Sequence, residues 1–393
     1  MKARLAIFVT HPVQYHVPIW RGLACTPGLE VEVFYFSDHS VRGGLDTGFG
    51  RNVSWDVPML EGYSHTFVSR DADLSRPDEV TLVEPEILLG DGGFTHVLIH
   101  GYTYGFEKQV LKAASKLGLR AIVRGEFADA GRNRNILKRT ARDIYLRRFY
   151  ARTDALCYVG SEARRHLSRF VSDESRLFFS PYSVDTELFE RQKAMFEPGS
   201  SRRALGVAED SFVFLFSGKL IPRKEPLLLI EALGRLPREM NVELLVVGDG
   251  PLKDAVVDRG NAVLGSRFHF RGFVNQRNLG GCFRASNALV LPSNYEAWGL
   301  VANEAMQFGL PVVLSDRVNS HEDLVVPSRT GYVFRSGDVN SLAEALSLLC
   351  SDPAKAATMG ARAAEHVQRF STTAAVRGLV DAVHGVSPEN VHA

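Results

Sequence analysis

Two carboxylates stand at the ends of a short segment that connects a predicted strand to a predicted helix. Glu296 follows the apolar run 288–292, and seven residues separate it from Glu304. Residues 299–308 have helical periodicity, which puts Glu296 in the loop and Glu304 on the helix. Carboxylates so placed can accept hydrogen bonds from hydroxyl groups at both ends of one polar ligand. The plainer alternative is a helix-start carboxylate and a solvated charge.

The start of this helix lies between the two glutamates, at Gly299, Leu300 and Val301. The first backbone N–H groups of a helix have no acceptor within it, so they can bind an anion or a sugar hydroxyl. Glycine at position 299 lets a ligand come close to the backbone, and Trp298 directly precedes it. We therefore expect a phosphate group to bind at this helix start.

A second segment concentrates positive charge after another predicted strand. Residues 213–217 are mostly apolar, and Gly218, Lys219, Arg223 and Lys224 follow them. Ligands of open α/β sheets bind at the carboxyl ends of the strands, which is where these cations fall. Lys and Arg neutralise a diphosphate through charge-assisted hydrogen bonds. We interpret the segment as a diphosphate-binding loop; a solvated turn is the alternative.

Polar side chains also stand at the ends of three predicted strands in the first half of the chain. They are His11, Gln14, Tyr15 and His16 near the end of residues 5–11, His100 and Tyr102 near the end of residues 96–101, and Glu126 after residues 120–125. At this sheet edge they can contact a diphosphate or a second substrate. Ordinary loop hydrogen bonds are the alternative for the histidines, and an arginine salt bridge is the alternative for Glu126.

Short apolar runs that alternate with helix-patterned segments must position these groups. The runs do not alternate between polar and apolar residues, which is typical of strands buried on both faces of a parallel sheet. Two consecutive strand–helix series predict an α/β protein with two Rossmann-like, doubly wound domains. The remaining predicted strands are residues 31–37, 155–161, 242–248, 268–273, 311–315 and 331–334.

The second series begins near residue 212, after a polar stretch at residues 191–203. We expect an N-terminal domain over residues 1–183 and a C-terminal domain over residues 184–371. A last helix, predicted at about residues 372–386, is expected to pack back on the N-terminal domain.

The two charged segments resemble the second domain of GT-B glycosyltransferases, in particular retaining family 4. The basic loop of that family has the form G-R/K-x-x-x-x-K, matched by Gly218, Lys219 and Lys224. Its E-x7-E motif is matched by Glu296 and Glu304. Two further segments between them are similar to family segments: residues 247–251, and Arg271, Gly272, Phe273 and Val274.

This resemblance implies a GT-B fold, in which two Rossmann-like domains face each other across a cleft that holds a nucleotide-sugar donor. Lys219 and Lys224 would bind the donor diphosphate, Glu304 the ribose hydroxyls, and Glu296 the transferred sugar. In many family members a histidine lies near the position of Glu126, so the chain departs from the family there. The remaining donor contacts that the resemblance implies are Gly218, Arg223, Gly272, Phe273, Val274, Trp298, Gly299, Leu300 and Val301.

The expected reaction moves the sugar to an acceptor hydroxyl with retention of anomeric configuration. UDP is the favoured nucleotide by family frequency, and GDP and ADP stay open. The acceptor is a glycan, a lipid-linked molecule or a small molecule. Two lysines and a helix start can stabilise the charge that grows on the leaving diphosphate, so we expect neither a metal nor a cofactor.

Composition narrows the partners and the location. Lys plus Arg is 46 and Asp plus Glu is 45, a balance that argues against nucleic acid. The first apolar run is too short for a secretory signal or a membrane span, and the four cysteines are scattered, so we expect a cytoplasmic protein. The basic segment from Arg132 to Tyr150 predicts an amphipathic helix that contacts the inner membrane face, or else a core-packed helix with a solvated basic face.

Other functions compete with a transferase. A nucleotide-sugar epimerase, hydrolase or phosphorylase can share the fold, and a protein that only binds the nucleotide sugar can share the donor motifs. A Rossmann oxidoreductase is disfavoured because no G-x-G-x-x-G follows the first strand. A glycoside hydrolase is disfavoured because its two carboxylates must flank the scissile bond.

Overall fold

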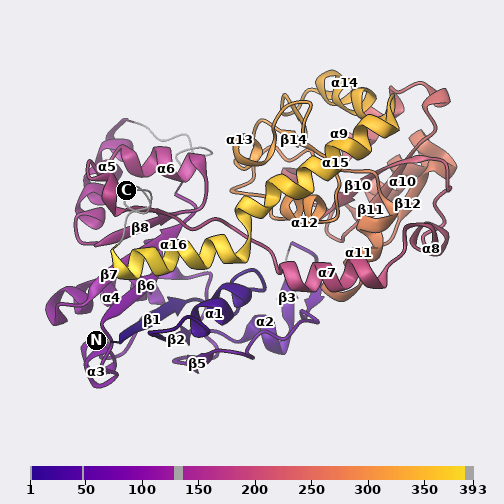
Figure 1. The fold of residues 1–393 in the computed structure, drawn as a ribbon. Helices are drawn as coiled ribbons and strands as arrows, with labels where there is room; N and C mark the ends of the chain where they lie inside the picture. Colours follow the sequence, from indigo (N-terminus) through magenta and orange to yellow (C-terminus); the bar gives the residue numbers. More distant parts are fainter. Residues whose placement is uncertain (1, 47, 128–135, 386–393) are drawn as a thin grey trace. The chain divides into compact units, whose positions relative to one another are not determined.

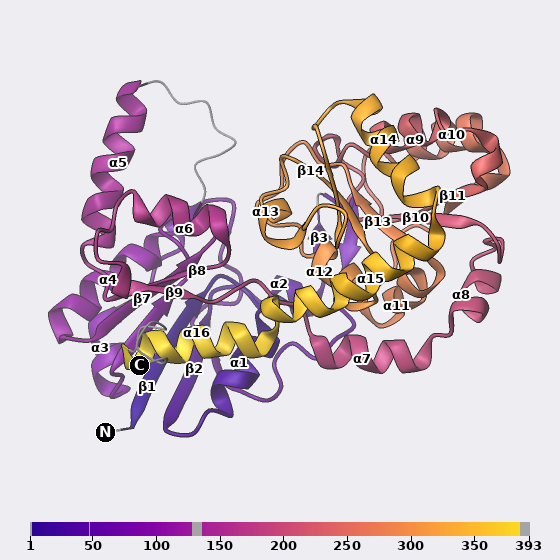
Figure 2. The same ribbon diagram turned by 45° about the horizontal axis from the view of Figure 1, so that its top comes forward.

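The chain forms two compact units (Figure 1, Figure 2). The computed structural model describes residues 2–46, 48–127 and 136–385. The first unit contains Met1–Arg42, Pro58–Ser183 and Ser371–Ala393, and the second contains Gly43–Val57 and Val184–Phe370. The sequence analysis did not foresee that Gly43–Val57 groups with the second unit.

The first unit is built on a seven-stranded parallel sheet of order β5-β2-β1-β6-β7-β8-β9. Its central strands are apolar runs with almost no exposed surface, as expected for strands covered on both faces. The short strands β5 and β9 were not predicted, and the others end within three residues of their predicted ends. The strands are β1 (Ala3–Val9), β2 (Leu29–Tyr35), β5 (Ser64–Phe67), β6 (His96–Ile99), β7 (Arg120–Gly125), β8 (Ala155–Tyr158) and β9 (Leu177–Phe179).

Helices connect these strands and pack against them. The C-terminal helix α16 contacts α1 and β9, and both views show it beside α1. Gly378 permits this packing, because a Cβ there would lie 1.9 Å from the carbonyl oxygen of Phe179. The helices are α1 (Val17–Ala24), α2 (His39–Arg42), α3 (Pro85–Asp91), α4 (Gly105–Leu117), α5 (Ile136–Tyr150), α6 (Ser161–Ser168) and α16 (Thr372–His384), with 3-10 turns at Pro77–Glu79 and Glu174–Arg176.

The second unit is built on a six-stranded parallel sheet of order β12-β11-β10-β13-β14-β15. All six strands were predicted, so the two doubly wound α/β units confirm the predicted fold class. The strands are β10 (Phe212–Ser217), β11 (Val242–Val247), β12 (Phe268–Phe270), β13 (Ala288–Leu291), β14 (Val312–Ser315) and β15 (Gly331–Phe334).

The helices of the second unit bury their apolar side chains against this sheet, and Phe214, Leu244 and Leu346 are fully buried in the resulting core. The helices are α7 (Thr186–Met195), α8 (Pro198–Ala204), α9 (Pro226–Gly234), α10 (Lys253–Leu264), α11 (Gln276–Ala285), α12 (Val301–Gln307), α13 (His321–Leu324), α14 (Val339–Cys350) and α15 (Pro353–Val367). The 3-10 turns are Pro222–Lys224, Arg238–Met240, Gly265–Arg267 and Gln368–Phe370.

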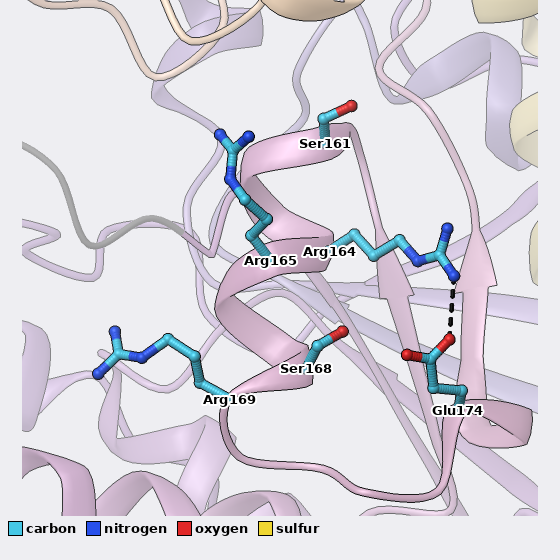
Figure 3. Close-up of a pocket in the computed structure, with 6 residues that line it drawn as sticks. All are labelled: Ser161, Arg164, Arg165, Ser168, Arg169 and Glu174. Carbon is cyan, nitrogen blue, oxygen red and sulfur yellow. Dashed lines mark hydrogen bonds and ion pairs between the residues drawn. The ribbon is translucent and has the colours of Figure 1, made fainter.

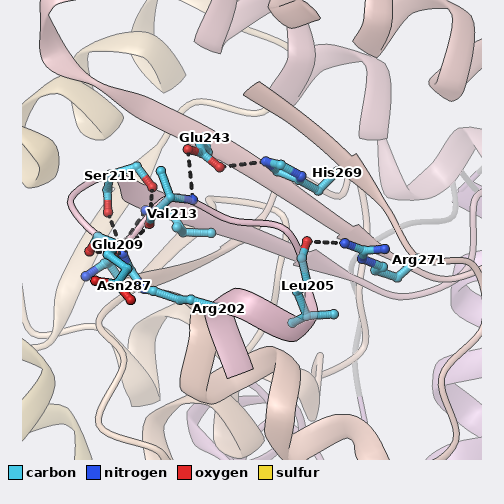
Figure 4. A network of polar contacts seen from close by, with 10 residues as sticks. Arg202, Leu205, Glu209, Ser211, Val213, Glu243, His269, Arg271 and Asn287 are labelled. Carbon is cyan, nitrogen blue, oxygen red and sulfur yellow. Dashed lines mark hydrogen bonds and ion pairs between the residues drawn. The ribbon is translucent and has the colours of Figure 1, made fainter. Parts of the chain in front are cut away.

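A polar network ties the amino ends of the second sheet together (Figure 4). Arg202 donates to the Asn287 side chain at 2.6 Å, and the same amide oxygen accepts from the backbone of Val213 at 2.8 Å. Glu243 lies 2.6 Å from His269 on the neighbouring strand. These contacts join residues at or near the amino ends of their strands, whereas the Arg271 contact with Leu205 in the same view follows the carboxyl end of β12.

The segment Gly43–Val57 contains a small antiparallel ribbon in which β3 (Gly44–Asp46) pairs with β4 (Arg51–Val53). It precedes most of the first unit in sequence and yet groups with the second unit. We call this segment the strap.

Candidate active site

Three loops leave the carboxyl ends of β10, β11 and β12 and are joined by backbone hydrogen bonds. The N–H of Gly218 donates to the carbonyl of Val247 at 3.0 Å, and that of Gly248 donates to the carbonyl of Gly272 at 2.8 Å. A Cβ atom on Gly248 would lie 1.8 Å from the carbonyl oxygen of Gly218, so glycine is needed for this close approach. The predicted phosphate loop is thereby held beside the loop that contains Phe273.

The basic loop also meets the loop that follows β13. Lys224 Nζ lies 2.5 Å from Glu296 Oε1, and Arg223 Nη1 lies 2.9 Å from the same oxygen. Arg223 also donates to the carbonyl of Tyr295, and the Ser293 hydroxyl donates to Glu296 at 3.3 Å. The side chains of Lys224 and Glu296 are only 12% and 10% exposed. A predicted phosphate ligand and the predicted sugar ligand therefore form one nearly buried ion pair.

The turn before α12 supplies backbone N–H groups next to Glu296. The helix begins at Val301, two residues later than predicted, and its hydrogen bonding starts with the Ala302 N–H, which donates to the carbonyl of Gly299 at 2.9 Å. Gly299 has a φ of +87°, and a Cβ there would lie 2.6 Å from Leu291. Glycine is therefore required for both backbone conformation and space, and Leu300 follows it as the N-cap residue.

Glu304 lies in the first turn of α12 and is 2% exposed. The Gln276 side chain, at the start of α11, donates to the Glu304 carboxylate at 3.5 Å. The carbonyl oxygen of Gln276 in turn accepts from the Gln192 side chain at 2.7 Å. Sequence analysis missed Gln276, because a single glutamine at a helix start has no chemical signature.

Trp298 anchors the same loop to the interior of the unit. Its side chain is 4% exposed, its ring lies 5.9 Å from the ring of Phe370, and its N–H donates to the Asn303 side chain at 2.8 Å. The indole is thus engaged in packing and hydrogen bonding within the second unit.

Lys219, the other predicted phosphate ligand, is paired with the strap. Its ammonium lies 2.8 Å and 2.9 Å from the two carboxylate oxygens of Asp46. Both side chains are about one-third exposed, at 34% and 30%. Sequence analysis did not single out Asp46, which lies 173 residues away in the chain.

In the first unit, two histidines that follow β1, His11 and His16, each contact a second histidine ring. His11 lies 4.4 Å from His39 and His16 lies 4.7 Å from His100, measured between ring centroids. Burial lowers the pKa of His11 to about 4 and that of His16 to about 3, and it also lowers the pKa of His100. These rings are therefore neutral at pH 7 and act as hydrogen-bonding groups, not as cations for a diphosphate. Gln14 is buried beside them in the same loop, and Tyr15 is half-buried.

Two further predicted residues of this unit have identified neighbours. The Tyr102 hydroxyl accepts from Arg142 at 3.3 Å, and its ring packs against Tyr145 and Phe149 of α5. Glu126 is exposed just beyond the end of β7.

Arg124 and Tyr182 lie beside Glu126 at this edge. Arg124 is fully buried and donates to the carbonyl oxygens of Ser180 and Pro181 at 3.2 Å and 2.8 Å. Tyr182 hydrogen-bonds with the Glu126 carboxylate. Its pKa is raised mainly by burial and then by the charge of that carboxylate. The surroundings of Glu126 therefore hold both a buried guanidinium and a phenol.

The basic segment from Arg132 to Tyr150 is described only in part, because residues 132–135 lie outside the described residues. On α5, Leu146 and Phe149 are buried, whereas Ile144 and Tyr145 are 47% and 39% exposed. The helix therefore packs on one side and presents apolar as well as basic side chains elsewhere. In the described part of the chain, no helix has the length and apolarity to cross a membrane.

A surface pocket of about 410 Å³ lies on α6 (Figure 3). It is lined by Ser161, Arg164, Arg165, Ser168, Arg169 and Glu174. Its three arginines form ion pairs with Glu174, Glu162 and Asp143. None of the predicted site residues lines it.

The chain contains an Asp-x-Asp triplet, Asp71-Ala72-Asp73, so the prediction of metal independence was wrong to assume that the sequence has none. Such triplets hold a metal in many other glycosyltransferases, so it bears on the expectation of metal independence. Here Asp71 accepts from the Ser69 hydroxyl at 3.2 Å, and Asp73 accepts from the backbone and hydroxyl of Ser75 at 3.0 Å and 2.6 Å. Both carboxylates thus stabilise a local turn in the first unit.

Known proteins resemble this chain in sequence and in fold. Residues 199–366 match the model of the family described as glycosyl transferases group 1. The chain is 33% identical to a D-inositol 3-phosphate glycosyltransferase of Streptomyces avermitilis, over 47% of this chain and 43% of the relative. It is 32% identical to the same-named protein of Stackebrandtia nassauensis, over 56% and 52%. The matches thus span about half the length of these relatives.

Solved structures match over nearly the whole chain. A sucrose-phosphate synthase from Thermosynechococcus elongatus aligns with a TM-score of 0.70 at 20% identity, over 97% of this chain and 98% of that protein. Anabaena HepE in complex with UDP aligns with a TM-score of 0.71 at 18% identity, over 98% and 100%. The chain therefore has the GT-B fold. The match to the group 1 glycosyl transferase family lies entirely within its second unit, at residues 199–366.

Proposed function

We propose that the protein transfers a sugar from a nucleoside-diphosphate sugar to an acceptor hydroxyl, with retention of anomeric configuration and without a metal. The observation that carries this proposal is the ion pair between Lys224 and Glu296, which joins the basic loop to the E-x7-E loop at the carboxyl edge of one sheet. The backbone N–H groups before α12 lie beside it. One ligand with a diphosphate and a sugar would contact all three features.

In the proposed reaction, the bond from the anomeric carbon to the donor phosphate breaks and a bond from that carbon to the acceptor oxygen forms. The leaving diphosphate gains negative charge, and Lys219, Lys224 and the backbone before α12 would stabilise it. The acceptor approaches from the face that the diphosphate leaves, so the leaving phosphate takes the acceptor proton. No protein base is then required.

The names of similar proteins support one nucleotide and one class of acceptor. A structural neighbour was solved with UDP and with UDP and glucose, which supports UDP as the nucleotide and a hexose as the sugar. The relatives named for inositol 3-phosphate support a small phosphorylated polyol among the acceptors. Glycans and lipid-linked molecules are the other acceptor classes.

A two-stage experiment tests the proposal. A thermal-shift screen of UDP, GDP and ADP sugars identifies the donor, and mass spectrometry of reactions with inositol phosphates, glycans and lipid-linked sugars identifies the product. We expect a stabilising donor and an acceptor whose mass increases by one sugar. Epimerised or hydrolysed sugar with every acceptor would instead favour an epimerase or hydrolase, and binding without turnover would favour a binding protein.

We further propose a cytoplasmic enzyme that contacts the membrane through α5. The exposed Ile144 and Tyr145 stand among the exposed Arg147 and Arg148, a combination that suits the surface of an anionic bilayer. Co-sedimentation with vesicles of phosphatidylcholine, with and without phosphatidylglycerol, tests this contact. Binding that requires the anionic lipid and is lost in an Ile144→Ser/Tyr145→Ser variant is expected.

A further inference from the structure

The strap, Gly43–Val57, lies against the loops that follow β10, β11 and β12, where the donor nucleotide is proposed to bind. At the loop after β12, the Asn275 side chain donates to the carbonyl of Ser54 at 2.7 Å, and the Arg277 N–H donates to Asp56 at 3.2 Å. At the loop after β11, Arg51 lies 3.8 Å from Asp249. The strap is thus held on the second unit by polar contacts along its length.

Two side chains of the strap contact the residues that are proposed to bind the nucleotide. Asp46 places both carboxylate oxygens within 2.9 Å of the Lys219 ammonium. Phe49 places its ring centroid 4.9 Å from the same ammonium and 5.0 Å from the ring of Phe273, at an interplanar angle of 80°. Phe49 therefore bridges Lys219, the proposed phosphate ligand, and Phe273, which the family resemblance implies as a donor contact and which we assign to the nucleotide base.

Glycines let the strap come this close. A Cβ on Gly48 would lie 2.6 Å from the Lys219 side chain, and a Cβ on Gly250 would lie 2.9 Å from the carbonyl oxygen of Gly48. The Asp46 carboxylate also accepts from the N–H groups of Gly48 and Phe49, at 2.9 Å and 3.1 Å. One carboxylate thus shapes the strap and neutralises Lys219.

We propose that the strap occupies the donor nucleotide site in the ligand-free protein and that the donor displaces it. The inference rests on the proposed function. A nucleoside diphosphate combines an anion with an aromatic base, and the strap offers an anion, Asp46, and an aromatic ring, Phe49, to the same two partners. The diphosphate and the Asp46 carboxylate repel each other and compete for the Lys219 ammonium, so they do not share it. Asp46 and Phe49 therefore set the affinity for the donor by opposing it.

The first test is calorimetric titration of the full chain with UDP, GDP and ADP. The variant Asp46→Asn keeps an oxygen for the backbone N–H groups of Gly48 and Phe49 and removes the charge. Because the ion pair is partly exposed, we expect Asp46→Asn to tighten nucleotide binding roughly threefold to tenfold. Phe49→Ala should also tighten binding. Asp258→Asn, an exposed change of the same charge on α10, is the matched control and should leave affinity unchanged.

Unchanged or weaker binding by Asp46→Asn would overturn the inference, because Asp46 would then position Lys219 for the donor and not compete with it. If UDP, GDP and ADP bind neither the wild type nor this variant, the proposed function itself fails and the inference fails with it. Thermal unfolding of each variant verifies that it is folded.

Hydrogen exchange provides the second test. Saturating UDP should increase amide exchange in peptides from Gly43–Val57, because a displaced strap loses its contacts with the second unit. Peptides from the basic loop should become more protected. Increased protection of the strap would show that it closes over the nucleotide as a lid, and this result would overturn the proposed displacement.

Discussion

The ammonium of Lys224 lies 2.5 Å from a carboxylate oxygen of Glu296, and neither side chain is more than 12% exposed. The pair links the loop after β10 to the loop after β13, and these two strands are neighbours in the sheet. A donor phosphate that binds Lys224 would therefore also affect the carboxylate proposed to hold the sugar.

The first prediction concerns the stability that this pair provides. Lys224→Met leaves the Glu296 charge nearly buried, and among the described residues Arg223 is then the one cation paired with it, so the variant should lower the free energy of unfolding by about 2 kcal/mol or more. Lys219→Met removes a pair that is one-third exposed and should cost less than about 1 kcal/mol. Urea unfolding of both variants measures the difference. Equal losses would show that burial does not distinguish the two pairs.

The second prediction divides the roles of the two glutamates. If Glu304 accepts from the ribose hydroxyls, Glu304→Gln should weaken the nucleoside diphosphate itself by roughly tenfold, since a hydrogen bond to a charged group contributes about 1.5–3 kcal/mol. Glu296→Gln should weaken the intact sugar donor more than the bare diphosphate. Calorimetry with UDP and with UDP-sugar measures both effects. Equal losses on both ligands in both variants would contradict the division.

The third prediction concerns the metal. Because Lys219 and Lys224 supply positive charge, we expect UDP binding and sugar transfer to persist in EDTA. The matched variants are Asp71→Asn and Asp73→Asn, which alter the Asp-x-Asp triplet and should leave binding unchanged. Wild-type binding that is lost in EDTA and restored by Mg²⁺ or Mn²⁺ would show that a metal is required. If EDTA has no such effect on either variant, the metal is assigned to this triplet.

The fourth prediction concerns acid stability. In the unfolded chain a histidine titrates near 6.5, whereas in the folded protein the pKa of His11 is about 4 and that of His16 about 3. As the pH falls, the unfolded state therefore binds protons at a higher pH than the folded state does. The free energy of unfolding that the two neutral rings contribute is fully present above pH 6.5. It is lost as the pH falls toward their pKa values in the folded protein, at up to about 1.4 kcal/mol per pH unit for each ring.

Urea unfolding between pH 8 and pH 5 measures this loss. His16→Asn cannot be protonated, so its stability should fall less steeply than that of the wild type over the same interval. A variant whose pH slope equals the wild-type slope would show that His16 is not protonated preferentially in the unfolded state.

The sequence predicted the sheets because their central strands are apolar on both faces. β7 has the predicted bounds, and it contains Ala121, Ile122 and Val123, all nearly or fully buried. β5 was missed because its residues are exposed and half-buried in alternation at the edge of the sheet, which leaves no apolar run. β9 has only three residues.

The candidate site stays a prediction, and the sequence could name only some of its segments. The basic loop and the E-x7-E loop each carry their charged residues within one short segment, so residue type and spacing indicate them as candidates. The contact between Asp46 and Lys219 joins residues 173 positions apart, and the strap has no local feature that names its partner. Trp298 was assigned to the donor from its place in the motif, although its burial could not be seen in the sequence.

The last prediction concerns Glu126, at a position where the family resemblance implies a histidine. The residue is exposed just beyond the end of β7, beside the buried Arg124 and hydrogen-bonded to Tyr182. In the proposed mechanism the leaving phosphate takes the acceptor proton, so Glu126 has only to position the sugar or the acceptor. Misplacement of reacting groups by a small distance can cost about a hundredfold in rate.

Glu126→Gln should therefore retain much of the transfer rate, because an amide still forms hydrogen bonds, whereas Glu126→Ala should lose far more. An essential base would make the two variants equally inactive. Transfer rates of both, with UDP affinity measured in each as the control, separate these cases. The affinity should not change, because Lys219, Lys224 and Glu304 are the residues proposed to hold the nucleotide. Near-wild-type transfer by Glu126→Ala would remove the residue from the site, since a positioning group cannot be deleted without cost to the rate.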